Sequence, residues 1–397
     1  MIILAILLTV FLTVGTIGVR AALRRKLHTW VPAYAVQALK PRSVVNAGPV
    51  DVLFCFVDHY EPGWNHVDYA MELRRVDGWY RGYPEMARDF VDADGFHPRH
   101  SWFYPPHYYR PEHLAKLVEL CIQGFGEIEM HLHHNRMDPF PDTSATLKQK
   151  ILSCIETYSK HGIFDTELNG ARIKRYAFIH GDWALDGSRS GYCGVNDELT
   201  ILRDTGCFAD FTFPAYMVES QPTRPNTIFY ATDDKIRPGS HRQGSPVRVG
   251  GTEHGDLLIV QGPLGFRWHV RSGIPLPKVD DGEICANNPP TKERVDHWIR
   301  SGIHVEGRPE WNIVKVFTHG ADEREHAVLL GDPIRMMHQH LQKAYNDGTR
   351  YRLHYVTARE LFNVIKAAEA GLSGDPGQYR DFLLKPYAYR HAEGECR

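Results

Sequence analysis

Three histidines fall within four positions of the segment EIEMHLHHN (127–135), at His131, His133 and His134. An imidazole ring offers an unprotonated nitrogen to zinc and similar divalent metals, and it exchanges protons near neutral pH. The three rings follow an alternation of apolar and polar residues that is typical of a β-strand. The segment therefore predicts a metal site with ligands drawn from these histidines.

Other strand-like runs also end in residues that carry chemistry. Three such runs occupy 50–59, 174–181 and 312–320. Their candidate residues are Asp58, His59, His180, Asp182, Trp183 and His319. Together with 126–133, four strand-like runs thus end in a histidine. One such run would be unremarkable, but four indicate that these strand ends converge on a single site.

The chemistry of this residue set is hydrolysis assisted by a divalent metal, most simply Zn²⁺. A bound metal lowers the pKa of a water molecule from about 15.7 towards 7. Asp58 is the candidate that accepts the proton of this water, and His319 is the candidate that protonates the leaving group. We expect His180, Asp182 and Trp183 to bind the substrate.

The elements that position these residues alternate between strands and helices from about residue 49. Further strands are predicted at 207–213 and 352–357, and helices at 110–124, 143–162, 196–206 and 357–371. In the segment 126–133, Ile128, Met130 and Leu132 share one face, which predicts packing against helices. His131 and His133 share the other face. This order favours an α/β protein with a (β/α) TIM-like barrel and its site at the carboxyl ends of the strands.

The N-terminal residues 1–19 carry no charge and are long enough, at roughly 28 Å as a helix, to cross a bilayer. Basic residues from Arg20 to Lys26 follow directly. The pattern predicts an uncleaved transmembrane anchor in the cell membrane, with the main domain in the cytoplasm. A poorly formed signal peptide is the alternative. The expected domains are the anchor 1–19, a juxtamembrane linker 20–48, the barrel 49–372 and a tail 373–397.

Charge and cysteine content narrow the class of protein further. The net charge is −2 and no long basic run occurs, so no nucleic-acid partner is expected. There are seven cysteines and no C-x-x-C pair, which argues against a zinc ribbon or a redox pair. Scattered thiols of this kind fit a reducing compartment better than a disulfide framework.

The segments FVDHYEP, EIEMHLHHN and KVFTHGADE resemble motifs of the NodB-like polysaccharide deacetylase superfamily, which includes carbohydrate esterase family four. The resemblance implies a distorted (β/α) barrel of the glycoside hydrolase and deacetylase type. It also implies a metal held by one acid and two histidines. His59 stands at the position of the acid ligand, so Asp58 is an alternative ligand. His131 matches the first histidine, and the second is His133 or His134.

The resulting expectation is a membrane-anchored, zinc-dependent hydrolase that removes an N-acetyl group from a sugar during cell-surface polysaccharide biosynthesis. Its partner would be a carbohydrate or lipid-linked saccharide. Two alternatives remain open at the level of the sequence. One is a glycoside hydrolase on the same barrel that uses two carboxylates, such as Asp58 and Asp182. The other is a catalytically silent scaffold of a polysaccharide assembly complex.

Overall fold

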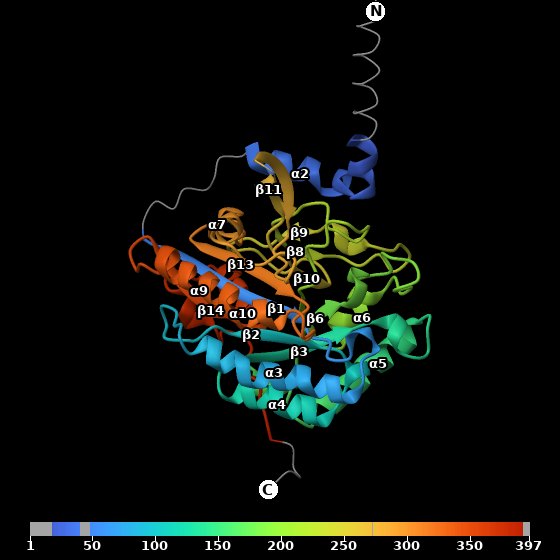
Figure 1. Cartoon of the computed structure of the whole chain (residues 1–397). Helices are drawn as coiled ribbons and strands as arrows, with labels where there is room; N and C mark the ends of the chain where they lie inside the picture. Colours follow the sequence, from blue (N-terminus) through green and yellow to red (C-terminus); the bar gives the residue numbers. More distant parts are fainter. Residues whose placement is uncertain (1–17, 40–47, 272, 392–397) are drawn as a thin grey trace, which may run out of the picture.

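The structure, a computed structural model, describes residues 18–39, 48–271 and 273–391 (Figure 1). Its centre is a ten-stranded sheet in the order β13-β1-β2-β3-β6-β7-β10-β8-β9, with β14 also paired to β1. The pairs from β13 to β10 are parallel, and β8 and β9 add an antiparallel end. The strands of this sheet are β1 (Val50–His59), β2 (His100–Tyr104), β3 (Gly126–Leu132), β6 (Tyr176–His180), β7 (Cys207–Asp210), β8 (Ile228–Ala231), β9 (Ser245–Pro246), β10 (Leu257–Val260), β13 (Trp311–Thr318) and β14 (Tyr351–Val356).

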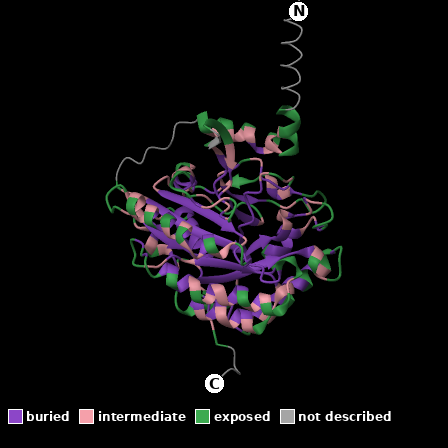
Figure 2. Ribbon diagram, viewed as in Figure 1, coloured by how far each residue is buried: buried purple, intermediate pink, exposed green. Residues whose placement is uncertain are grey.

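Helices cover the sheet, and two small hairpins lie beside it. The hairpins are β4 (Asp165–Leu168) with β5 (Ala171–Lys174) and β11 (Gly265–Arg271) with β12 (Ile274–Asp280). The helices are α2 (Leu27–Leu39), α3 (Tyr69–Ala87), α4 (Pro111–Ile122), α5 (Ser144–Ser159), α6 (Glu198–Asp204), α7 (Lys292–Arg300), α8 (His326–Leu329), α9 (Asp332–Tyr345) and α10 (Ala358–Glu369). Figure 1 shows α3 and α4 below the sheet, and Figure 2 shows that the strands are buried while the helices expose their outer faces.

Both faces of the sheet are apolar, as expected for parallel strands covered on two sides. Along β1, Phe54 joins a core shared with α3 and α4, whereas Leu53 points to the opposite core. The predicted packing of Ile128, Met130 and Leu132 against helices is confirmed, because all three lie in the first core with residues of α4.

The expected TIM-like barrel is wrong, because the sheet is an open one that curves without closing. Its path ends at β13 on one side and β9 on the other. The curvature is strong, since Lys315 of β13 donates to the carbonyl of Phe211 just after β7, at 2.6 Å. Helix α10 packs on that same face, where Leu361 and Ile365 share the second core with Leu53. In a closed barrel, layers of side chains from the strands fill the interior. Here α10 occupies the corresponding space.

The predicted membrane anchor, residues 1–19, lies outside the described residues except for its last two positions. Among the residues that the structure describes, no helix has both the length and the apolar character needed to span a bilayer. The described residues thus do not support the predicted transmembrane helix or the single-pass location in the cell membrane. The segment expected to be a linker contains α2, where Trp30 is fully buried and stacks on Phe266 with ring centroids 5.4 Å apart.

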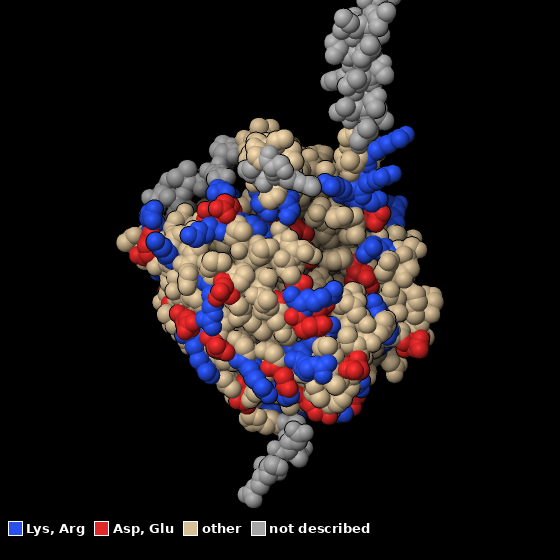
Figure 3. Space-filling view, in the orientation of Figure 1, with Lys and Arg blue, Asp and Glu red and all other residues tan. Residues whose placement is uncertain are grey.

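The described C-terminal residues pack against the sheet. The hydroxyl of Tyr387 donates to Glu129 Oε1 at 2.9 Å, and the hydroxyl of Tyr389 accepts the backbone N–H of Ile128 at 3.0 Å. Residues 373–391, expected as a tail, therefore support the central strand β3. On the surface visible in Figure 3, acidic and basic side chains are interspersed.

Candidate functional site

The carboxyl ends of four parallel strands, β13, β1, β3 and β6, surround a pocket with a volume of about 320 Å³. Parallel strands in one sheet place these ends at a common edge, so residues distant in sequence meet there. The residues that line the pocket are His59, Glu61, Trp64, His133, Asp182, Trp183, His319, Ala321, Asp322, Arg324 and Glu325.

A cluster of three buried ligand-type side chains lies at the wall of this pocket. His133 Nε2 is 3.1 Å from His131 Nε2 and 3.0 Å from Glu61 Oε1. The cluster meets the geometry for a common cation, because the three ligand atoms lie within 4.8 Å of one another. We call Glu61, His131 and His133 the pocket triad.

The backbone and one acid behind the two histidines fix the orientation of their rings. His131 donates its Nδ1–H to the carbonyl of Ile179 at 2.9 Å, and His133 donates its Nδ1–H to Asp182 Oδ2 at 3.0 Å. Both Nε2 atoms are thereby left to face the triad. Such outer partners are typical of metal-binding histidines, where they fix the tautomer and raise the basicity of the ligand.

Glycine at position 181 allows this arrangement. A Cβ atom there would lie 2.4 Å from Cγ of the His133 ring, which is far closer than such atoms approach. The glycine therefore lets the β6 end pass directly over the imidazole. Asp182 and Trp183 follow it with φ values of 55° and 51°, a left-handed turn that directs both residues to the pocket.

The pKa values of the triad show how its charges are balanced. Burial opposes ionisation of Glu61, but the hydrogen bond with His133 lowers its pKa to about 2. Burial likewise opposes protonation of His133, but Asp182 and Glu61 raise the pKa of His133 to about 9. Burial lowers the pKa of His131 to about 3, so this ring is neutral. One proton on His133 Nε2 serves either Glu61 or His131 but not both, whereas a divalent cation accepts all three lone pairs.

This donor set fits zinc or a similar ion. Two imidazoles and one carboxylate form a known catalytic zinc set that leaves an open position for water. The open side here is the pocket itself. The sequence-based assignment of a divalent metal to this edge thus has a concrete ligand set, in which Glu61 replaces His59 or Asp58.

Two further histidines border the pocket. The ring of His59 lies 4.6 Å from the ring of His319 and 5.0 Å from that of His131, measured between centroids. Burial and the neighbouring His319 hold the pKa of His59 well below its usual value, so its ring is neutral. Trp183 lies 6.0 Å from His59 and 5.8 Å from His319, between ring centroids, and forms part of the same wall.

Asp58, the predicted proton acceptor, does not line the pocket. Its side chain is fully buried, and it accepts the backbone N–H of Gly320 at 2.7 Å and the His100 Nε2–H at 3.0 Å. The strand alternates at this point, so Asp58 and His59 face opposite ways. The acid links the carboxyl ends of β1 and β13 to the start of β2 instead of facing the pocket.

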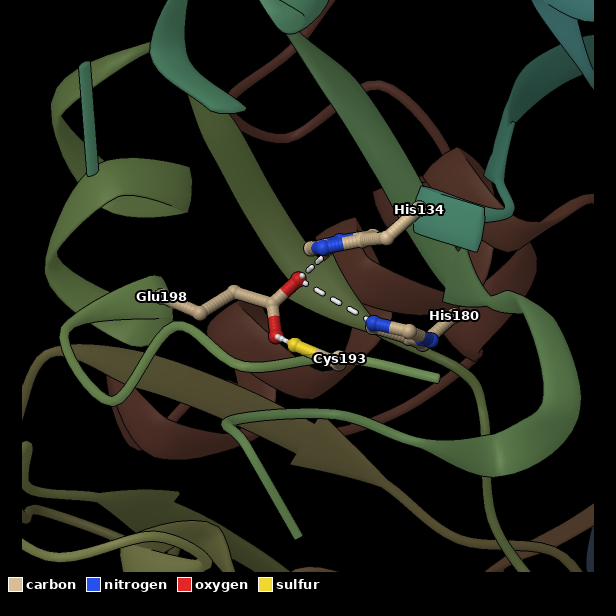
Figure 4. Close-up of side chains that lie close together, drawn as sticks. All are labelled: His134, His180, Cys193 and Glu198. Atoms are coloured by element: carbon tan, nitrogen blue, oxygen red, sulfur yellow. Dashed lines mark hydrogen bonds and ion pairs between the residues drawn. The ribbon is translucent and has the colours of Figure 1, made fainter. Parts of the chain in front are cut away.

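His134 and His180 also point away from the pocket. Both join a separate buried cluster with Cys193 and Glu198 (Figure 4). Of the two histidines that the sequence left open as the second ligand, His133 lies with His131 and Glu61 at the pocket, and His134 does not. Of the three predicted substrate-binding residues, Asp182 and Trp183 reach the pocket and His180 does not.

Glu61 is the functional residue that sequence reasoning did not identify. It follows the end of β1 by two positions, where the chain has already left the strand. Alternation along the strand cannot predict the direction of a side chain beyond its end. The acid in the segment DHYEP was the available signal, since it stands close to the same strand end as His59.

No family model matches the chain, and no curated protein matches it. Among solved structures, the chain is similar to a GH57 branching enzyme from the hyperthermophilic archaeon Thermococcus kodakaraensis, determined in complex with glucose. The identity is 10%, the TM-score is 0.34, and the match covers 77% of this chain and 69% of the other.

The resemblance to NodB-like polysaccharide deacetylases is corrected by these findings. No family model supports it. The likeness to the branching enzyme, at a TM-score of 0.34, carries no argument about function.

Proposed function

We propose that this chain is a metal-dependent hydrolase that acts on a carbohydrate, with Glu61, His131 and His133 as the metal ligands. The observation that supports the proposal is the pocket triad, in which three buried acceptor atoms converge beside an open pocket. A divalent cation in such a site lowers the pKa of a water molecule and polarises the bond to be cleaved.

The chain's own residues supply the remaining chemistry. His59 is neutral and lies next to His319, whose half-exposed ring reaches the mouth of the pocket. This pair is placed to take a proton from the reacting water and pass it outward or to a leaving group. We assign proton transfer to these two rings in place of Asp58.

The pocket walls favour a sugar as the substrate. Trp64 and Trp183 present aromatic surface, on which the apolar face of a sugar ring packs. Asp182, Asp322 and Arg324 supply polar groups for hydroxyls. A volume of about 320 Å³ is at the small end of ligand pockets, which suits one terminal sugar unit better than a long stretch of glycan.

A second candidate is a glycoside hydrolase that uses carboxylates without a metal. It is favoured by the number of acids at the pocket, namely Glu61, Asp182, Asp322 and Glu325. Two carboxylates on either side of a glycosidic bond suffice for that reaction. The two candidates differ in one measurable property, because only the first loses activity when metal is removed.

The test combines metal analysis with a panel of aryl glycosides and acylated sugars. We expect the wild-type chain to hydrolyse one of these two substrate classes. It should lose that activity when metal is removed by a chelator and regain it with Zn²⁺ or a related ion. Glu61→Gln and His131→Ala should each lose one equivalent of metal and the activity. The control His254→Ala changes an exposed histidine and should do neither. Equal metal content in wild type and both triad variants would overturn the proposal, and activity that survives chelation would favour the second candidate.

A further inference from the structure

A second cluster of ligand-type residues lies behind the pocket wall, fully buried. It consists of His134, His180, Cys193 and Glu198, each at most 1% exposed (Figure 4). One ligand atom from each lies within 4.8 Å of those of the others. His134 follows β3, His180 ends β6, Cys193 lies in the loop that follows, and Glu198 begins α6. We call these four residues the buried tetrad.

Two imidazole nitrogens of the tetrad make no hydrogen bond: His134 Nδ1, which lies 3.3 Å from Asp142 Oδ2, and His180 Nε2. His180 donates its Nδ1–H to the carbonyl of Gly181 at 2.5 Å, so its Nε2 carries a lone pair. That Nε2 points at Glu198 Oε1, 3.4 Å away, with no hydrogen bond between them. An unpartnered acceptor atom facing a carboxylate in a fully buried place is costly.

The other contacts of Glu198 complete a converging set. Its Oε1 is 3.0 Å from His134 Nε2, and its Oε2 is 3.3 Å from the sulfur of Cys193. Around a zinc ion with Zn–N and Zn–S bonds of about 2.1 and 2.3 Å, tetrahedral ligand atoms lie about 3.3–3.8 Å apart. The three separations from Glu198 differ from these by only a few tenths of an ångström, and the remaining ligand atoms lie within 4.8 Å of one another.

We propose that the buried tetrad binds a structural zinc ion. One thiolate, one carboxylate, two neutral imidazoles and Zn²⁺ sum to zero charge, so the site adds no net charge to the interior. The ion also gives the free lone pair of His180 a partner. Four protein ligands leave no open position, which is the arrangement of a structural site and not of a catalytic one.

The buried site would hold the wall of the pocket. His134 is adjacent to His133 of the pocket triad, and His180 lies two residues before Asp182, which orients His133. A cation bound to the tetrad would therefore fix both strand ends that position the pocket triad. It would also tie the loop 181–197 to α6 through Cys193 and Glu198.

Cobalt distinguishes the two proposed sites, because only the buried tetrad contains sulfur. Metal-free protein should be titrated with Co²⁺ and followed by absorbance. We expect a thiolate-to-cobalt charge-transfer band in the near ultraviolet, and in Glu61→Gln, which should lack the pocket metal, this band should saturate at one equivalent of cobalt per chain. Bound cobalt without this band in the wild-type chain would overturn the proposal, independently of any variant.

Variants assign the band to its ligand. Cys193→Ser should abolish it, whereas the matched control Cys285→Ser changes a half-exposed thiol elsewhere and should retain it. A band that persists in Cys193→Ser would also overturn the proposal. Glu61→Gln should keep the band while losing the pocket metal, so failure of the proposed function and failure of this inference give different results.

Discussion

The carboxylate of Asp182 accepts a hydrogen bond from Nδ1 of His133 at 3.0 Å, while Nε2 of the same ring faces His131 and Glu61. Asp182 therefore contacts the triad through the His133 ring. Its negative charge makes the ring a stronger ligand and keeps its Nδ1 protonated. In metal binding the acid is therefore a positioning residue that acts through His133.

The change Asp182→Asn tests this relationship. The amide oxygen still accepts the Nδ1–H, so the ring stays in place, but the charge behind it is lost. We expect the affinity of the pocket metal to fall by about 10–100-fold, in line with the effect of such outer partners. Competition with a chromophoric chelator measures this affinity. Asp322→Asn is the matched control, because Asp322 lines the same pocket but is paired with Arg324. Equal affinities in Asp182→Asn and wild type would refute the role of Asp182.

Asp58 is expected to matter for folding instead of metal binding. Its buried carboxylate accepts from Gly320 and His100, and Asn keeps the shape while removing the charge. We expect Asp58→Asn to lower the free energy of unfolding by about 1–3 kcal/mol, with the metal content unchanged. Denaturant unfolding and metal analysis test both parts. Asp204→Asn, a half-exposed change, should stay within about 0.5 kcal/mol of wild type. If Asp58→Asn lost metal while its free energy of unfolding stayed unchanged, Asp58 would have a role in metal binding instead.

The sequence predicted the local elements of the fold better than their arrangement. All six predicted strands appear, and the helix predicted at 357–371 is α10, which begins with a capping box formed by Thr357 and Glu360. The strand β2 was missed because HSWFY is aromatic on both faces and shows no alternation. The sequence also did not predict that α10 packs on the inner face of the sheet. Nearly all residues of α10 are buried, so its sequence pattern does not indicate which face of the sheet it contacts.

The candidate site was predicted in its location but not in its detail. Strand ends carrying His131, His133 and His319 do meet at one edge, which parallel pairing requires. The division of neighbouring residues between two clusters was not predictable. His133 and His134 are adjacent, yet they face the pocket triad and the buried tetrad respectively. The turn after β3 decides this, and no periodicity extends through a turn.

Trp183 should contribute to substrate binding more than to the chemical step. Its ring stands at the pocket beside His59 and His319. For a sugar substrate, we expect Trp183→Ala to raise KM about 3–10-fold, which corresponds to about 0.5–1.5 kcal/mol, with a smaller change in kcat. Trp183→Phe should recover part of the loss. Trp268→Ala, on an exposed hairpin, is the control for removing an indole. An unchanged KM in Trp183→Ala would place the substrate elsewhere.

The buried His354, distant in sequence from both clusters, should make the free energy of unfolding depend on pH. Its Nε2 and Nδ1 contact Asp51 and Asp94 at 2.9 and 2.8 Å, inside the fold. Burial alone would lower its pKa, but the two acids raise the pKa of His354 to about 9. Arg352 and Arg380 contact the same two acids and stay charged through this range.

The folded protein therefore holds a proton on His354 that the unfolded chain releases near pH 6.5. The resulting stabilisation is complete below pH 6.5 and is lost as the pH rises through about 9. We expect the difference in unfolding free energy between wild type and His354→Gln to decrease by on the order of 2 kcal/mol between pH 6 and pH 10. Urea unfolding at several pH values measures it. Because Lys315 and other groups titrate equally in both proteins, their contributions cancel in the difference. A difference that stays constant across this range would show that His354 is neutral in the folded protein.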